Sequence, residues 1–314
     1  MHAVFHNIGV FFHHLAAVGW GALAVALVCH FTKLCCVSRA WRNIVAAAYP
    51  DRRVRWRSVL AAFLARVGVN AVVPARAGDA VALYIVRRRV EGSSYATLAS
   101  SLVLLTLFDS VAASCFILWA LTLGVLPGHQ ILARLPSFDF GWLFAHLRAS
   151  LIVLGIVLLL LLLLLLWALE AIAEFRSRVR RGFAILGRPR EYLRRAAFWQ
   201  ACDWSLRLAA NYWFLRAFHL PATLHNAVLV QVTQSLAALF PLSPSGIGTE
   251  QALLLYIFRG KAARTALLSF SVGMRVTLVV FNAVLGAAAL LVTMQTLRFR
   301  SRIERDRAAE EATI

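Results

Sequence analysis

The sequence predicts an all-α fold, a polytopic helical bundle in a membrane, and three observations support this prediction. Hydrophobic residues make up 61% of the chain and charged residues 15%, against roughly half and a quarter in soluble domains. Several apolar runs reach the ~20 residues with which a helix crosses a bilayer. The basic residues gather between these runs, because 23 of the 33 Lys and Arg lie in four clusters, at 33–57, 87–89, 176–195 and 298–307.

About five full spans are predicted within a single membrane domain, residues 1–314, which no polar linker divides. Each span is an apolar run bounded by basic or turn-forming residues, and the runs cover residues 8–31, 96–123, 151–169, 197–218 and 265–296. The third run contains nine consecutive leucines, which we expect to face lipid. A basic tail, residues 298–314, follows the last span.

The positions of the basic clusters predict the topology and argue against nucleic acid as a partner. A net charge of +19 would suit a nucleic-acid-binding protein, but no motif of that class accompanies it. Basic loops beside apolar spans follow the positive-inside rule, which keeps them cytoplasmic, and they attract anionic lipid head groups. We therefore expect an inner-membrane protein with its N-terminus outside, its C-terminus cytoplasmic, and membrane lipids as partners.

The basic stretch 174–195, between the third and fourth spans, is broken at Gly187 and Pro189. An amphipathic helix of this composition can dock on anionic lipid. The same stretch can equally be a solvated cytoplasmic loop, and the sequence leaves both interpretations open.

Two further apolar segments are too short for two crossings, which would need about 40 residues and a turn. The first has 29 residues between Arg57 and Arg87 and is broken at residues 74–79, and the second, residues 226–258, is broken at 241–250. We expect two re-entrant or broken helical hairpins. The alternative is a pair of ordinary helices kinked by their prolines.

The two breaks share a pattern that predicts an internal repeat. Each has a proline, a glycine four residues later, an acid just beyond and a Leu-Tyr-Ile-x-Arg exit: Pro74, Gly78 and Asp79 in the first, and Pro244, Gly248 and Glu250 in the second. The approximate halves are residues 1–123 and 142–297, and hairpins that open to opposite sides would relate them by inverted topology. Broken helices at matching positions of inverted repeats mark substrate sites in many transporters.

Ionisable side chains inside the predicted spans and hairpins point to a polar interior. Unpaired, each costs roughly 2.5–3.5 kcal/mol at mid-membrane, so four acids and four bases predict mutual pairing around a cavity: Asp79, Asp109, Asp203, Glu250, Arg66, Arg76, Arg207 and Arg275. Asp203 and Arg207 are four residues apart and can form a purely structural pair on one helix. The other three guanidinium groups could hold a phosphate through bidentate hydrogen bonds.

The candidate substrate-binding or transport residues combine the two breaks with these charges. They are Arg66, Asn70, Pro74, Arg76, Gly78, Asp79, Asp109, Pro244, Gly246, Gly248, Glu250 and Arg275. No metal site or cofactor is predicted, and no Walker motif points to ATP as a direct energy source.

Three elements resemble the transmembrane region of lysylphosphatidylglycerol synthases and their stand-alone flippase-like relatives, over nearly the whole chain. They are Arg-Ala-Trp-Arg at 39–42, Asn-x-x-x-Pro-x-Arg-x-Gly-Asp at 70–79, and the Pro/Gly-rich segment 240–250 with its acid. The chain departs from the family at Asp109, the one residue kept of a Glu-Arg-x-x-Asp element, at Ser245 in place of a glycine, and in a shorter Gly248 to Glu250 spacing. These departures bear on the substrate more than on the fold.

The resemblance implies translocation of a phospholipid or related phosphate-bearing envelope lipid, with hopanoid and glycolipid pathways also linked to stand-alone relatives. The aminoacyltransferase domain of full-length synthases does not occur in this sequence, so we expect no synthesis of lysyl-lipid. Two alternatives stay open. One is a non-transporting scaffold for envelope-lipid biosynthetic enzymes, and the other is a membrane-embedded lipid-modifying enzyme with paired acids as acid and base. The enzyme is disfavoured because no nucleophile lies beside a base.

Overall fold

The computed structural model describes residues 18–73, 76–122, 173–239, 249–259 and 263–311, and every regular element in these ranges is helical. The main helices are α2 (Trp20–Ala48), α3 (Trp56–Val72), α4 (Ala77–Arg89), α5 (Tyr95–Thr122), α9 (Ala173–Gly182), α11 (Phe198–Ala217), α12 (Leu224–Leu239), α13 (Thr249–Ile257) and α14 (Arg264–Glu311). Three short helical turns join α9 to α11: η1 (Ala184–Gly187), α10 (Pro189–Tyr192) and η2 (Leu193–Ala197). The predicted all-α fold is confirmed for the described residues.

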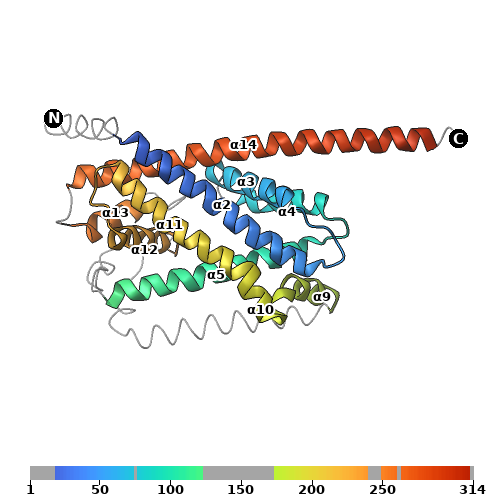
Figure 1. Ribbon diagram of the computed structural model, residues 1–314, viewed down its shortest axis with the longest axis horizontal. Coiled ribbons are helices and arrows are strands. Elements are labelled where there is room, and N and C mark those ends of the chain that lie inside the picture. The colour runs from blue at the N-terminus through green and yellow to red at the C-terminus, as the bar shows by residue number, and fades with distance from the viewer. Residues whose placement is uncertain (1–17, 74–75, 123–172, 240–248, 260–262, 312–314) are drawn as a thin grey trace, which may run out of the picture.

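An antiparallel pair, α2 and α11, forms the centre of the bundle (Figure 1). The amide of Gly19, just before α2, donates to the carbonyl of Ala217 at the end of α11 over 2.8 Å. Around this pair lie α5, the α3–α4 hairpin and the α12–α13 hairpin, while α14 packs across α3 and extends beyond the bundle at its C-terminal end (Figure 1).

Three of the helices, within Trp20–Ala48, Tyr95–Ala120 and Arg264–Thr293, are long and apolar enough to cross a membrane. Two of them, α14 and α5, carry exposed large apolar side chains at a spacing of four residues, which puts these side chains on one side of each helix. On α14 these are Val276, Val280 and Val284, between 55% and 62% exposed, and on α5 they are Val103, Leu107 and Val111. Contiguous exposed apolar faces are rare in soluble monomers, so these faces fit contact with lipid.

Most of the predicted element boundaries lie within a few residues of the helix ends. The runs 96–123, 197–218 and 265–296 are confirmed as helices in α5, α11 and α14. Run 151–169 lies outside the described residues, so the number of spans stays a prediction. The basic stretch is broken where expected, since η1 ends at Gly187 and α10 starts at Pro189.

The first helix differs from its predicted range, 8–31. Residues 8–17 lie outside the described part, and α2 continues to Ala48, through basic residues that were assigned to a cytoplasmic loop. The helix continues because tertiary contacts stabilise this part of it, where the basic side chains have partners within the bundle. Lys33 is half-buried, and the guanidinium of Arg39 lies over the rings of Trp56 and Trp199 at 5.3 and 5.7 Å.

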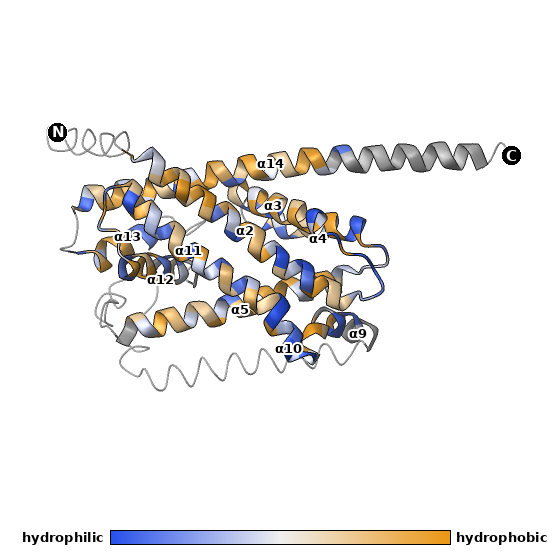
Figure 2. Cartoon of the chain, viewed as in Figure 1, coloured by the Kyte–Doolittle hydropathy of each residue, from blue (hydrophilic) through white to orange (hydrophobic). Residues whose placement is uncertain are grey.

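The two predicted hairpins open at opposite ends of α2. The outer ends of α3 and α4, at Val59 and Val86, share a buried apolar cluster with Val45 near the C-terminus of α2. The outer end of α13, at Phe258, belongs to a second cluster with Leu23 near the N-terminus of α2. Hydrophilic residues collect at the first of these ends, around α10 and the end of α4 (Figure 2). This arrangement is compatible with inverted repeats, which stay a prediction.

The crossing of α3 and α14 depends on two glycines. A Cβ atom placed on Gly68 would lie 2.5 Å from the Cα atom of Gly286 and 2.7 Å from the carbonyl oxygen of Asn282. Because both contacts are with backbone, we expect Gly68→Val to separate the helices and lower the free energy of unfolding by about 1–3 kcal/mol. Thermal unfolding in mild detergent measures this. Gly187→Val, where nothing lies within 4 Å, is the control, and equal stability of the two variants would contradict the close crossing.

Candidate functional site

The tip of the first hairpin is a hydrogen-bonded cluster of four residues, Arg66, Asn70, Gly78 and Asp79, which we call the tip cluster. Arg66 Nε donates to Asp79 Oδ1 at 2.6 Å, and Asn70 Nδ2 donates to the same oxygen at 3.2 Å. Asn70 Oδ1 in turn accepts from the amide of Gly78 at 2.8 Å. The first amides of a helix have no partner within it, so the Asn70 side chain satisfies one of those at the start of α4.

Glycine is required at position 78 by the closeness of the two helices. A Cβ atom there would collide with the carbonyl oxygen of Arg66, one turn before Asn70 on α3. Arg76, two residues before Gly78 and just before α4, has φ 56° in the left-handed region and is exposed. The absence of a side chain at Gly78 therefore allows the backbones of α3 and α4 to come together.

The tip cluster lies at the end of α3 and the start of α4, and it is partly exposed. Helices α3 and α4 have 17 and 13 residues, which at 1.5 Å per residue makes each shorter than the ~30 Å hydrocarbon core of a bilayer. The side chains of Arg66 and Asp79 are 20% and 28% exposed. The terminal guanidinium nitrogens of Arg66 have no hydrogen-bonding partner among the described residues, which leaves them available to a ligand.

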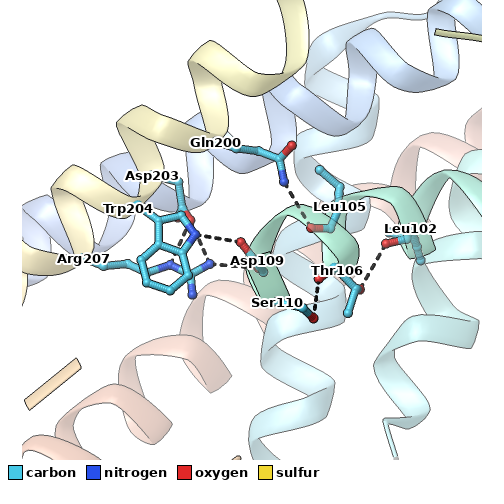
Figure 3. Close-up of polar contacts among 9 residues, drawn as sticks. All are labelled: Leu102, Leu105, Thr106, Asp109, Ser110, Gln200, Asp203, Trp204 and Arg207. Atoms are coloured by element: carbon cyan, nitrogen blue, oxygen red, sulfur yellow. Dashed lines mark hydrogen bonds and ion pairs between the residues drawn. The ribbon is translucent and has the colours of Figure 1, made fainter. Parts of the chain in front are cut away.

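A second charged group, the central cluster, joins α5 to α11. Arg207 binds Asp203 through Nη2 at 2.7 Å and Nε at 2.8 Å, and its Nη2 also reaches Asp109 Oδ2 at 3.2 Å. Trp204 Nε1 donates to Asp109 Oδ1 at 3.0 Å, and the guanidinium lies 4.9 Å from the Trp204 ring centroid. Figure 3 shows the three α11 side chains turned toward Asp109 on α5.

The central cluster balances its charges across three helices. Lys33 on α2 is close enough to interact electrostatically with both Asp203 and Asp109. Asp203 is 1% exposed, whereas Asp109 and Arg207 are 33% and 23% exposed. Two acids facing two bases avoid the cost of an uncompensated buried charge. A cluster closed on one side and open on the other suits both a structural link and a contact with a polar ligand.

At the second hairpin, Glu250 at the start of α13 faces Arg275 on α14. The separation between Glu250 Oε2 and Arg275 Nη1 is 3.5 Å, and the side chains are 5% and 37% exposed. Gln234 on α12 lies close to Glu250, and its Nε2 contacts Met274 Sδ on α14 at 3.9 Å. This carboxylate therefore links the start of α13 to α14, with α12 beside them.

The predicted pairing of intramembrane charges is confirmed for three groups of residues. Asp79 pairs with Arg66, Glu250 with Arg275, and Arg207 with both Asp203 and Asp109. Pro74, Pro244, Gly246 and Gly248 lie outside the described residues, so a meeting of the two hairpin tips stays a prediction.

Two participants in the central cluster, Lys33 and Trp204, were not predicted from the sequence. Nor was the hydrogen bond of 2.8 Å between His30 on α2 and Asn282 on α14. The helical spacing of the apolar residues in α2 could have indicated Lys33. Ala26, His30, Val37 and Trp41 are buried at helical spacing, and Lys33 falls in the same stripe.

These features define the protein as a polytopic helical membrane protein with paired charges and a broken-helix hairpin inside its bundle. Residues 3–307 match the lysylphosphatidylglycerol synthase TM region family, and the chain belongs to this family. The suspected resemblance is thereby confirmed, and the family name links the chain to membrane lipids. No curated protein and no solved structure matches the chain.

Proposed function

We propose that the protein translocates a phosphate-bearing lipid between the leaflets of the inner membrane. The observation that carries this proposal is the tip cluster, a partly exposed Arg66–Asp79 pair at the tip of a hairpin whose helices are each shorter than the hydrocarbon core of a bilayer. Backbone that leaves a helix at membrane depth is tolerated where protein or a water-filled cavity satisfies it. Such a cavity would carry the head group while the acyl chains stay in lipid.

The chemistry of the clusters supports an anionic head group. The guanidinium groups of Arg66 and Arg275 are each paired with a carboxylate. A phosphate offers the same bidentate oxygen geometry, so it can displace that carboxylate or bind the guanidinium together with it. Alternating between an internal acid and a substrate phosphate keeps the cation paired during transport. In this mechanism the protein forms no covalent intermediate, so we do not propose an enzymatic activity.

Reconstitution into liposomes tests the proposal. A fluorescent phospholipid is placed in both leaflets, and a membrane-impermeant quencher measures how fast the inner-leaflet lipid becomes accessible. We expect faster exchange than in empty liposomes, and we expect Asp79→Asn to reduce the added rate at least tenfold because Arg66 loses its charged partner. Several head groups are tested in parallel.

The control is Asp51→Asn, which neutralises an exposed carboxylate in the loop between α2 and α3. It should leave the rate unchanged. Exchange no faster than in empty liposomes, across all head groups tested, would refute translocation. Copurified envelope-lipid enzymes, together with normal function in cells carrying Asp79→Asn and Glu250→Gln, would then favour a scaffold.

A further inference from the structure

A second concentration of arginines surrounds a cavity at the basic end of the bundle, away from the clusters described above. The cavity has a volume of about 350 Å³ and lies between the C-terminal part of α2, the following loop and the η1–α10–η2 turns. Its charged lining consists of five arginines and one glutamate: Arg42, Arg52, Arg53, Arg188, Arg195 and Glu191. We call it the arginine cavity.

The walls of the arginine cavity are fixed by hydrogen bonds that do not use up its charges. Arg42 Nε donates to the carbonyl of Val54 at 3.0 Å, which holds the loop against α2. Asn43 Nδ2 donates to the backbone carbonyl of Arg195, which ties α2 to η2. The Nη2 group of Arg42 has no hydrogen-bonding partner among the described residues. The cavity is therefore built by the fold and still presents N–H donors.

The charge of the cavity calls for an anion. Its one carboxylate, Glu191, is engaged at 3.7 Å by Arg188, so the remaining arginines face one another without an acid of the lining between them. Like charges brought together in this way repel, and a bound anion relieves the repulsion. Arginine binds phosphate oxygens in pairs. A volume of 350 Å³ is near the lower end for ligand pockets, which suits a head group better than a whole lipid.

Exposed apolar side chains in the segment that lines the cavity indicate that the anion belongs to a membrane lipid. Leu186 on η1, Leu193 on η2 and Phe198 at the start of α11 are 43%, 61% and 56% exposed, and they alternate in the chain with Arg188, Arg190 and Arg195. Basic and apolar side chains interleaved along one segment are typical of binding in the membrane interface. The apolar residues can lie among acyl chains while the arginines reach the phosphate level.

We propose that the arginine cavity binds the phosphate head group of an anionic membrane lipid at the cytoplasmic surface. The lipid docks the η1–α10–η2 turns onto the membrane and joins them to the end of α2. This site is separate from the hairpin clusters, and the inference does not depend on translocation.

Binding of a short-chain phosphatidylglycerol to the purified full-length protein in detergent tests the site. We expect saturable binding, and we expect Arg53→Gln with Arg195→Gln to weaken it at least tenfold, since each removes a charge-assisted contact. The matched control is Arg57→Gln with Arg88→Gln, two exposed arginines that do not line the cavity, and it should bind as the wild type does. Ala47→Phe, which fills the cavity and keeps every charge, should also abolish binding.

Two further ligands distinguish the possible sources of the phosphate. Short-chain phosphatidylcholine should bind at least tenfold more weakly, because its ammonium group is repelled by the arginines. Inorganic phosphate should compete only weakly, because it lacks the acyl chains. Equal loss in the two double variants, unchanged binding in Ala47→Phe, equal affinity for phosphatidylcholine, or full competition by inorganic phosphate would each overturn the assignment to an anionic lipid.

Discussion

Arg207→Met is expected to lower the free energy of unfolding by about 3–5 kcal/mol, the usual cost of breaking a buried ion pair by removing one partner. The guanidinium of Arg207 is bound by both carboxylates of the central cluster. Without it, Asp203, only 1% exposed, is left with Lys33 as the nearby cation. Thermal unfolding in mild detergent and gel filtration of the purified variant measure the loss.

A matched substitution and a compensating variant make this result specific. Arg216 lies on the same helix and is exposed, and its guanidinium also lies over a tryptophan ring, 5.2 Å from the centroid of Trp213. The matched substitution is Arg216→Met. We expect it to change stability by less than about 1 kcal/mol, as for most surface sites. Adding Asp109→Asn to Arg207→Met should recover much of the loss, because the remaining acid, Asp203, is then balanced by Lys33. A double variant less stable than Arg207→Met would contradict this account of the cluster.

Local sequence patterns predicted the parts of the fold that depend on a single helix. Apolar runs located α5, α11 and the membrane part of α14. Each of these helices needs an apolar run of its own, whichever helices it packs against. The spacing of four residues predicted the Asp203–Arg207 pair, which the structure confirms. The first Pro/Gly break predicted the interruption between α3 and α4, because Asn70 and Gly78 act within one short segment.

Contacts between distant helices could not be predicted in this way. The sequence does not indicate that Asp109 on α5 meets Arg207 on α11, because the contact depends on how the two helices are rotated and shifted against each other. Lys33 is a second example, because its position in the bundle also depends on contacts with other helices. Its charge placed it in a cytoplasmic loop by the positive-inside rule, whereas α2 continues through it and turns it toward Asp203. Helical periodicity alone would have assigned Lys33 to the inner face.

Gly78→Ala is expected to abolish translocation with a smaller effect on stability than Arg207→Met. The added Cβ atom collides with the backbone carbonyl of Arg66, so α4 must move away from α3 and stretch the Arg66–Asp79 hydrogen bond of 2.6 Å. Overpacking of this kind costs about 1–3 kcal/mol. The liposome exchange assay measures the transport rate, and thermal unfolding measures stability.

Gly21→Ala provides the matched control, because nothing lies within 4 Å of a Cβ atom at that helical position. An alanine there favours the helix by up to about 1 kcal/mol, so the control should be at least as stable as the wild type and should transport normally. Gly78→Ala should still bind short-chain phosphatidylglycerol at the arginine cavity, since Gly78 does not line it. A folded Gly78→Ala protein that binds the lipid and also exchanges it at the wild-type rate would show that the geometry of the tip cluster does not limit transport, and the proposed pathway would then have to run elsewhere in the bundle.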